Sequence, residues 1–412
     1  MNMHDQMEES EVSILHTYNR FPVVFEKGEG CHLYDSEGKE YLDFAAGIAV
    51  NALGYHYPGY DEALKSQIDK LTHISNLYYN EPIIDAGAKL VQASHMEKAF
   101  FTNSGTEAIE GALKAAKKYA YARDGHADHE IIAMNHSFHG RSIGALSVTG
   151  TAHYREPFEP LMGGVKFADF NDLESVKAQV TDKTCAIILE PLQGEGGFIP
   201  APIEFVKKLR KICDDNGIML IADEVQCGNC RTGKYFTSEY WKEAGAAPDI
   251  IATAKSMGAG VPISAISARE EVMDAAPAGT IGGTYCGNPL ACAAAIKTME
   301  IMKEEDYCAK SIHIGSVVRK AFEKMKEKYD IIGDVRGIGG MLGIEFVKDK
   351  ERKEPNPEFV SKLVQTALQK GLLLENAGSF GNVIRFLAPL CMTEEQMETG
   401  LKIFEESILA NL

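Results

Sequence analysis

The stretch IADEVQCGNCRTG, residues 221–233, places an acidic pair directly before two cysteines. Cys227 and Cys230 have the C-x-x-C spacing of a zinc knuckle or a redox pair. A zinc site needs two further ligands at a matching spacing, and the sequence has no second C-x-x-C. His126 and His129 could complete such a site only if folding happened to bring them there. The sequence therefore favours the acidic pair, and we expect no metal site.

The acidic pair Asp223-Glu224 ends an apolar run, which implies that Asp223 is buried at the end of a strand. Open α/β sheets place their ligands at the carboxyl ends of their strands. A buried carboxylate needs a partner. Asp223 could cap the next turn as a structural residue, or it could pair with the protonated ring nitrogen of a ligand. Val225 would face the same side of the strand.

Lys255 ends the mostly apolar run DIIATAK. A lysine is seldom buried unless it is paired or covalently used. Desolvation lowers the pKa of a lysine and leaves the amine free to form a Schiff base with an aldehyde. The alternative is a lysine at a strand end whose ammonium group reaches out to water.

Residues 103–120, NSGTEAIEGALKAAKKYA, place a small turn directly in front of an amphipathic helix. The free N–H groups of the first helical turn can hold an anion such as phosphate. Ser104, Gly105 and Thr106 form that turn. An ordinary capping box between Ser104 and Glu107 would explain the same residues.

Short apolar runs alternate with helical patterns through the middle of the chain. The strand candidates are residues 130–135, 164–170, 185–191, 218–225, 250–255 and 262–268. Several are hydrophobic along their whole length, as are strands buried on both faces. This alternation predicts an α/β layer with a mostly parallel sheet.

A chain of 412 residues is too long for one compact core, so we expect two lobes. Residues 62–304 form the predicted large domain. Residues 305–412 change to a charged helix, short strands and a closing helix, which predicts a smaller α+β domain. Residues 1–61 contain a predicted hairpin and are expected to pack against that smaller domain.

The composition limits the classes of partner. The 42 basic and 59 acidic residues give a net charge of −17, which disfavours nucleic acid and anionic membranes. The acidic N-terminus does not resemble a signal peptide, and no stretch reaches the ~18–20 apolar residues of a membrane span. Nine cysteines, an odd number, fit reduced thiols. We expect a soluble, cytoplasmic protein.

Six motifs follow one another in a fixed order: SGT (104–106), SFHGRS (137–142), EPLQGEGG (190–197), DEVQCGNCRTG (223–233), DIIATAKSMG (249–258) and GGTYCGNP (282–289). This set resembles the class III pyridoxal-phosphate aminotransferases, the ω-aminotransferase group, over nearly the whole chain. The resemblance implies a fold-type I transferase with a large, mostly parallel, seven-stranded α/β domain and a smaller α+β domain. It also implies pyridoxal 5'-phosphate (PLP) as cofactor and a homodimer with shared active sites.

The resemblance also implies the cofactor contacts. Lys255 resembles the lysine that forms the Schiff base and carries a proton between the substrate carbon and the cofactor's C4′ carbon. Asp223 matches the carboxylate that keeps the ring nitrogen protonated, so that the ring acts as an electron sink. The other implied contacts are the phosphate cup Ser104, Gly105 and Thr106, the ring contacts Phe138 and Val225, Gln226 near the 3′-oxygen, and Thr284, which reaches the phosphate of the neighbouring subunit.

The substrate contacts follow from the same resemblance. Arg141 resembles the arginine that grips the distal carboxylate of donor and acceptor. Arg385 matches the arginine for the α-carboxylate of 2-oxoglutarate. Glu195 resembles a switch that neutralises this arginine and swings aside when 2-oxoglutarate arrives, and the alternative is a structural ion pair that never opens. Ile48 and Tyr79 are expected to face the substrate.

The subgroup signals are mixed. TYNRFPVVFEKGEG, GIAVNALGY and NLYYNEP are similar to acetylornithine aminotransferases, whereas GEGGF, GGTYCGNPLACAAA and NAGSFGNVIRFLAPL look more like 4-aminobutyrate aminotransferases. Both groups deaminate a terminal amine and use 2-oxoglutarate. We favour N-acetylornithine as donor, because the substrate-facing residues lie in the N-terminal part. A racemase or epimerase on the same fold would keep every cofactor residue and remains an alternative.

One departure from the family pattern lies beside the cysteines. The family usually has glycine where Cys230 stands and an aromatic or apolar residue near Asn229. The loop before Arg231 is therefore expected to differ in shape.

Overall fold

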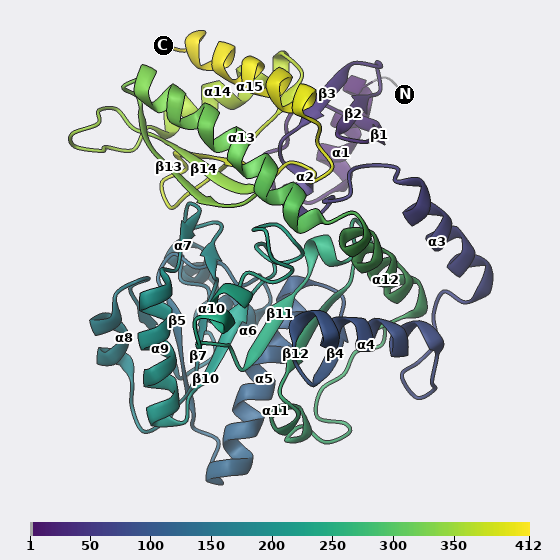
Figure 1. Ribbon diagram of the computed structural model, residues 1–412, viewed down its shortest axis with the longest axis vertical. Coiled ribbons are helices and arrows are strands. Elements are labelled where there is room, and N and C mark those ends of the chain that lie inside the picture. The colour runs from purple at the N-terminus through teal and green to yellow at the C-terminus, as the bar shows by residue number, and fades with distance from the viewer. Residues whose placement is uncertain (1–2) are drawn as a thin grey trace.

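The computed structural model describes residues 3–412, so the first two residues of the predicted segment 1–61 lie outside it. The large lobe is built on a seven-stranded sheet in the order β4-β12-β11-β10-β7-β5-β6 (Figure 1). Its strands are β4 (Lys98–Thr102), β5 (Glu130–Met134), β6 (Val165–Ala168), β7 (Thr184–Leu189), β10 (Met219–Asp223), β11 (Ile250–Thr253) and β12 (Ser264–Ala268). Only β12 runs antiparallel to its neighbours, β11 and β4. The predicted mostly parallel, seven-stranded sheet is confirmed.

Helices cover both faces of this sheet, and the side chains of each strand alternate between the two faces. Leu220 packs with α4 (Glu81–Ser94), α9 (Ile203–Asn216) and α12 (Pro289–Glu304) on one face. Its neighbour Ile221 packs on the opposite face with the alanine-rich stripe of α5 (Gly105–Asp124). Burial on both sides explains the unbroken hydrophobicity of the inner strands.

The C-terminal lobe combines a second sheet with three long helices. The sheet order is β13-β14-β17-β16, and its neighbouring strands are antiparallel. Its elements are α13 (Tyr307–Lys328), β13 (Ile332–Ile338), β14 (Met341–Phe346), α14 (Pro357–Gln369), β16 (Glu375–Ala377), β17 (Val383–Phe386) and α15 (Glu394–Leu409). Phe322, Phe346 and Phe404 pack between the sheet and the helices. This lobe has the α+β character that the sequence predicts.

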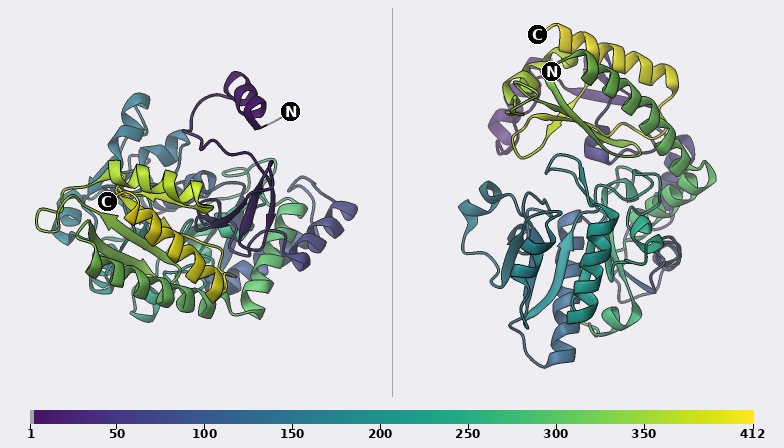
Figure 2. Two further views of the ribbon diagram at one scale, coloured as in Figure 1. Left: turned by 90° about the horizontal axis from the view of Figure 1, so that it is seen from above. Right: turned by 60° about the vertical axis from the view of Figure 1, so that its left-hand side comes forward.

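The N-terminal strands join the C-terminal lobe. They are β1 (Phe25–Glu29), β2 (His32–Asp35) and β3 (Glu40–Asp43). β2 and β3 form the predicted antiparallel hairpin, and β3 pairs in parallel with β15 (Leu372–Leu373). Helix α1 (Met3–Ser13) buries none of its residues and lies away from the rest of the chain (Figure 2, left).

Shorter elements complete the fold. They are α2 (Ala46–Ala49), α3 (Pro58–Lys70), α6 (Ile143–Ser147), α7 (Ala152–Arg155), the 3-10 helix η1 (Glu156–Phe158), α8 (Leu173–Gln179), β8 (Leu192–Gln193), β9 (Ile199–Pro200), α10 (Glu239–Glu243), the 3-10 helix η2 (Lys255–Met257) and α11 (Glu270–Asp274). Within residues 3–412, no helix has both the length and the apolar character needed to cross a membrane.

Candidate active site

A cavity of about 490 Å³ lies where β10 and β11 end, on the side of the sheet that faces the C-terminal lobe. This is the edge at which open α/β sheets bind ligands. The lining residues are Val50, Asn103, Ser104, Gly105, Thr106, Phe138, His139, Gly140, Arg141, Glu190, Glu195, Asp223, Val225, Gln226, Ala254, Lys255, Gly260, Val261, Pro262 and Ile263. The chain therefore brings together most of the residues that the sequence singled out.

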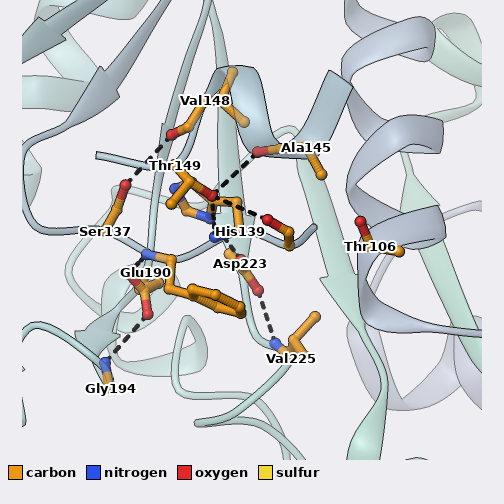
Figure 3. A network of polar contacts seen from close by, with 12 residues as sticks. Thr106, Ser137, His139, Ala145, Val148, Thr149, Glu190, Gly194, Asp223 and Val225 are labelled. Atoms are coloured by element: carbon orange, nitrogen blue, oxygen red, sulfur yellow. Dashed lines mark hydrogen bonds and ion pairs between the residues drawn. The ribbon is translucent and has the colours of Figure 1, made fainter. Parts of the chain in front are cut away.

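Asp223 is the last residue of β10 and is buried, as its apolar strand predicts. Its Oδ1 accepts a hydrogen bond from the N–H of Val225 at 3.0 Å, and its Oδ2 lies 2.6 Å from Nδ1 of His139 (Figure 3). A carboxylate can accept further hydrogen bonds beyond these two. Asp223 is thus held rigidly by the protein and can still accept an N–H from a ligand in the cavity.

His139 and Glu190 are site residues that the sequence reasoning did not assign. The His139 Nε2 atom is buried and has no hydrogen-bond partner among the described residues. The Glu190 carboxylate accepts from the N–H groups of Gly194 and Phe138 at 3.1 and 3.3 Å. Burial, together with the nearby charge of Asp223, raises the pKa of Glu190 well above its ordinary value. His139 lies in the motif SFHGRS and Glu190 in the motif EPLQGEGG. Their place in these motifs was the one sequence signal that could have identified them as site residues.

Lys255 follows β11 and begins η2 with a left-handed φ of +50°. Its side chain lines the cavity together with Asp223. Burial lowers the pKa of Lys255 to about 8, although the negative charge of Glu195 acts in the opposite direction. A large fraction of this amine is therefore unprotonated near pH 8, the form that attacks an aldehyde.

The N-terminus of α5 forms one end of the cavity. Gly105 is required there, because a Cβ atom would lie 2.9 Å from Cγ1 of Val225. The Ser104 hydroxyl does not cap the backbone of its own helix but donates to Glu107 at 3.2 Å. The Thr106 hydroxyl accepts from the N–H of Ser142 at 3.0 Å. A first turn without a side-chain cap leaves backbone N–H groups that can bind an anion.

Phe138 and Val225, the two ring contacts implied by the family resemblance, also line the cavity. Phe138 and Val225 are half-buried, and Phe138 packs edge-on against Tyr154 with ring centroids 5.9 Å apart. Gln226 adjoins them, and its Oε1 has no hydrogen-bond partner in the described chain. An unpaired buried amide oxygen can accept a hydrogen bond from a polar group of a ligand.

Arg385 sits between two carboxylates. Its Nη1 donates to Glu195 at 2.6 Å, and its Nε lies 3.4 Å from Oε2 of Glu375. Burial acts to raise the pKa of Glu195, but the charges of Arg385 and Lys255 hold it below its ordinary value. Glu195 and Arg385 therefore form a charged pair at the cavity wall.

Arg141 marks the outer part of the cavity. Its guanidinium group lies 4.0 Å from the ring centroid of Tyr154 and 5.3 Å from that of Phe138. Aromatic faces orient a guanidinium without using its hydrogen-bond donors. Arg141 is exposed to solvent, so its donors can reach a carboxylate that enters the cavity.

Arg385 does not line the cavity itself but contacts Glu195, which does, and three further predicted residues lie outside the cavity of the single chain. Ile48 is 38% exposed with a φ of +64°, and Val50 lines the cavity instead. Tyr79 is 95% exposed in the loop before α4. Thr284 is exposed beside α12. The described chain does not bring these side chains to Lys255.

The two cysteines of the C-x-x-C spacing face different partners. The Cys227 thiol lies 3.2 Å from Oε2 of Glu224, whereas Cys230 neighbours Cys308. Asn229 and Cys230 have φ values of +55° and +66°, a region that favours glycine, which explains why glycine suits this loop. The Asn229 amide donates to the carbonyl of Ala254 at 3.2 Å and so supports the residue before Lys255.

His126 and His129 cannot join those cysteines in one metal site. With Asp124 they form a cluster whose ligand atoms lie within 4.8 Å of one another. The cluster follows the C-terminus of the 20-residue helix α5, whereas the cavity adjoins its N-terminus. At ~1.5 Å per residue the helix separates the two by roughly 30 Å. A zinc knuckle built from these histidines and Cys227 is therefore ruled out by geometry.

Comparisons with known proteins agree with this geometry. The model of the family described as aminotransferase class-III matches residues 14–408. The chain is 44% identical over 402 residues to an acetylornithine aminotransferase of Clostridium acetobutylicum, covering 97% of this chain and 100% of the relative. It is 42% identical over 393 residues to one of Methanocaldococcus jannaschii, covering 95% of each chain.

Solved structures give the same result. The ornithine aminotransferase of Toxoplasma gondii superposes with a TM-score of 0.92 at 30% identity, over 100% of this chain and 96% of that one. The acetylornithine aminotransferase of Elizabethkingia anophelis superposes with a TM-score of 0.86 at 32% identity, over 100% of both chains.

Proposed function

The chain belongs to the class III aminotransferases, and from that premise we propose that it moves the terminal amino group of N-acetylornithine to 2-oxoglutarate, giving the semialdehyde and glutamate. The observation that carries the choice of donor is the 44% identity, over 97% of the chain, to a relative named acetylornithine aminotransferase. The membership itself makes the protein a PLP-dependent transaminase.

The cavity fits this cofactor by its own chemistry. Asp223 can accept an N–H from the ring, and the first turn of α5 offers N–H groups to a phosphate. The amine of Lys255, with a pKa of about 8, faces the same space. Bound PLP supplies an aldehyde that takes up the amino group and a ring that withdraws electrons from the substrate carbon.

Two residues of this chain carry the proton chemistry in our proposal. Lys255 Nζ holds the cofactor covalently and later moves a proton at the reacting carbon, for which a pKa near the working pH is suited. Asp223 keeps the ring nitrogen protonated through its negative charge. His139 fixes the orientation of Asp223 through the 2.6 Å contact.

Two arginines then distinguish the substrates. Arg141 holds the distal carboxylate of either substrate, and Arg385 holds the α-carboxylate of 2-oxoglutarate. Without Glu195, Arg385 would keep only its 3.4 Å contact with Glu375 during the donor step, and a buried cation so weakly paired is costly. The ion pair with Glu195 at 2.6 Å avoids this cost and must open for the acceptor.

A panel of amino donors tests the proposal. Glutamate release from 2-oxoglutarate is measured with N-acetylornithine, ornithine and 4-aminobutyrate. We expect kcat/KM for N-acetylornithine to exceed that for 4-aminobutyrate by at least about tenfold, equivalent to ~1.4 kcal/mol. A preference for 4-aminobutyrate would show that 4-aminobutyrate, and not N-acetylornithine, is the donor. Racemisation of one enantiomer without a keto acid would show that the protein is a racemase or epimerase.

We also propose that the protein works as a homodimer. Leu77, Tyr78, Tyr79 and Tyr285 are between 63% and 95% exposed. The amide of Asn76 donates to the carbonyl of Cys286 at 2.7 Å and joins the two segments into one surface. Exposed apolar patches of this kind mark interfaces. A second copy covering the patch would bring Thr284 toward the partner's phosphate site.

Mixed dimers test this arrangement. Lys255→Ala and Thr284→Ala subunits are each impaired alone. If Thr284 serves the neighbouring subunit, a mixed dimer contains one site with both residues intact, so mixing should restore activity. If Thr284 serves its own subunit, no intact site forms and no activity returns. The net charge of −17 supports the further proposal that neither nucleic acid nor an anionic membrane is a partner. We also propose that the protein acts in the cytoplasm.

A further inference from the structure

Two cysteines far apart in the sequence meet away from the cavity. The sulfur atoms of Cys31 and Cys391 are 3.6 Å apart, although 360 residues separate them along the chain. Cys31 directly precedes β2, and Cys391 follows the segment after β17. The pair thus joins the N-terminal segment to the last turn before α15.

The backbone on both sides holds this pair in place. The carbonyl of Cys31 accepts from the N–H of Asp43 at 2.9 Å, and the N–H of Leu390 donates to Ala52 at 2.8 Å. A Cβ atom on Gly54 would lie 2.8 Å from the sulfur of Cys391, so the close packing there depends on glycine. The two sulfur atoms need to approach by only about 1.5 Å to bond, since a disulfide bond is ~2.05 Å long.

The two thiols differ in access and acidity. Cys31 is 1% exposed, whereas Cys391 is half-buried and can meet a small reagent. The neighbouring Cys31 thiol holds the pKa of Cys391 below its ordinary value, and the charge of Lys310 acts in the same direction. The contact with Cys391, together with burial, raises the pKa of Cys31. Its greater exposure makes Cys391 the thiol of the pair that a reagent meets first.

We propose that Cys31 and Cys391 form a site of thiol–disulfide exchange that reduces one small-molecule disulfide and closes a disulfide between themselves. The Cys391 thiolate attacks a sulfur of the reagent, forms a mixed disulfide and releases one thiolate. Cys31 then loses its proton, attacks Cys391 and displaces the second thiol. Two protein thiols are oxidised, and one disulfide becomes two thiols.

The closed bond would restrict the unfolded chain. A loop of 360 residues loses much of its freedom when its ends are joined. The oxidised protein should therefore melt at a higher temperature than the reduced protein, and a reductant should reverse the shift.

Glutathione disulfide added to the holoenzyme tests the proposal. Peptide mapping should find the Cys31 and Cys391 peptides joined, with the loss of two hydrogen atoms. Cys31→Ser should stop the reaction at glutathione attached to Cys391, and Cys391→Ser should leave Cys31 unmodified. Cys213→Ser is the matched control, since Cys213 is also buried but lies in α9, and the linkage should persist there.

Two results would overturn the proposal. One is glutathione held on Cys391 of the unmutated protein without linkage to Cys31. The other is two unreacted thiols after treatment. Because the mapping is done first on the unmutated protein, the conclusion does not depend on how well the serine variants fold.

Discussion

The acidity of Lys255 is set by its neighbours. Burial lowers its pKa, Glu195 raises it and Arg385 lowers it, and together they bring the pKa from 10.5 to about 8. Only the unprotonated amine can attack an aldehyde. The rate at which the cofactor-free protein captures PLP should therefore rise with pH, with a midpoint near pH 8, and then level off. Stopped-flow absorbance measures this rate directly.

The variant Glu195→Gln tests how the charge of Glu195 affects the pKa of Lys255. Glu195→Gln removes a negative charge that favours the ammonium form of Lys255, so the midpoint should move to lower pH. Phe138 and Asp223, the proposed contacts of the cofactor ring, are unchanged in this variant. A midpoint that stays near 10.5 in the unmutated protein would show that Lys255 is not buried as described.

We propose that His139 acts on the chemistry through Asp223, with which it makes a 2.6 Å contact. Replacing it by alanine should leave PLP bound, since His139 does not hold the phosphate end. Turnover should fall by roughly 10- to 100-fold, the equivalent of ~1.5–3 kcal/mol for one charged hydrogen bond. His95→Ala, at an exposed histidine after α4, is the control. An unchanged rate in His139→Ala would mean that Asp223 needs no such support.

The first turn of α5 depends on one glycine. In Gly105→Ala the new Cβ would lie 2.9 Å from Val225. This close contact would push the first turn of α5 away from Val225. We expect Gly105→Ala to weaken PLP binding at least tenfold in an equilibrium titration. Gly111→Ala lies in the middle of the same helix, where its Cβ would meet Ile266 at an ordinary 3.6 Å. That variant should bind PLP normally and gain ~0.5–1 kcal/mol of stability.

The loop that carries Glu195 is clamped by the C-terminal lobe. The N–H of Gly378 donates to the carbonyl of Glu195 at 3.0 Å, and the Arg336 side chain donates to Gly197 at 2.6 Å. Only the side chain of Glu195 is then free to leave Arg385. Glu195→Ala should favour glutamate over the best ω-amine by roughly 5- to 100-fold in single-turnover rates, or ~1–3 kcal/mol for one charged contact.

Glu375→Gln is the comparison for that experiment. Glu375 also faces Arg385, at 3.4 Å, but makes no hydrogen bond to it. Its removal should change the ratio of the two rates less than the removal of Glu195. Equal ratios in Glu195→Ala and the unmutated protein would mean that the pair is structural and never opens.

For the molecule as a whole, the sequence predicts what depends on neighbours along the chain. The buried strands β7 and β10 can be predicted from the sequence because their residues are apolar, apart from Thr184 at the start of β7 and Asp223 at the ligand edge of β10. β4 was not among the predicted strands, because its run KAFFT begins with a lysine and has only three apolar residues. Most of the residues that line the cavity could be predicted from three sequence features: the ends of strands, the N-terminus of a helix and the family motifs.

Contacts made across the fold are not readable in the same way. His139 looks like any polar loop residue until β10 places Asp223 beside it. The meeting of Cys31 with Cys391 depends on the pairing of β3 with β15 and on the path of the last loop. Tyr79 and Thr284 are exposed and lie away from the cavity of the single chain, and only the homodimer that we propose would place them beside a cavity.

The central claim is that Lys255 is the residue that holds PLP. Reduction of the holoenzyme with borohydride makes that bond permanent, and peptide mapping then locates it. We expect one cofactor per chain, attached to the peptide that contains Lys255, and none in Lys255→Ala. Cofactor fixed to a different lysine, or an unmodified Lys255 in fully active protein, would contradict it.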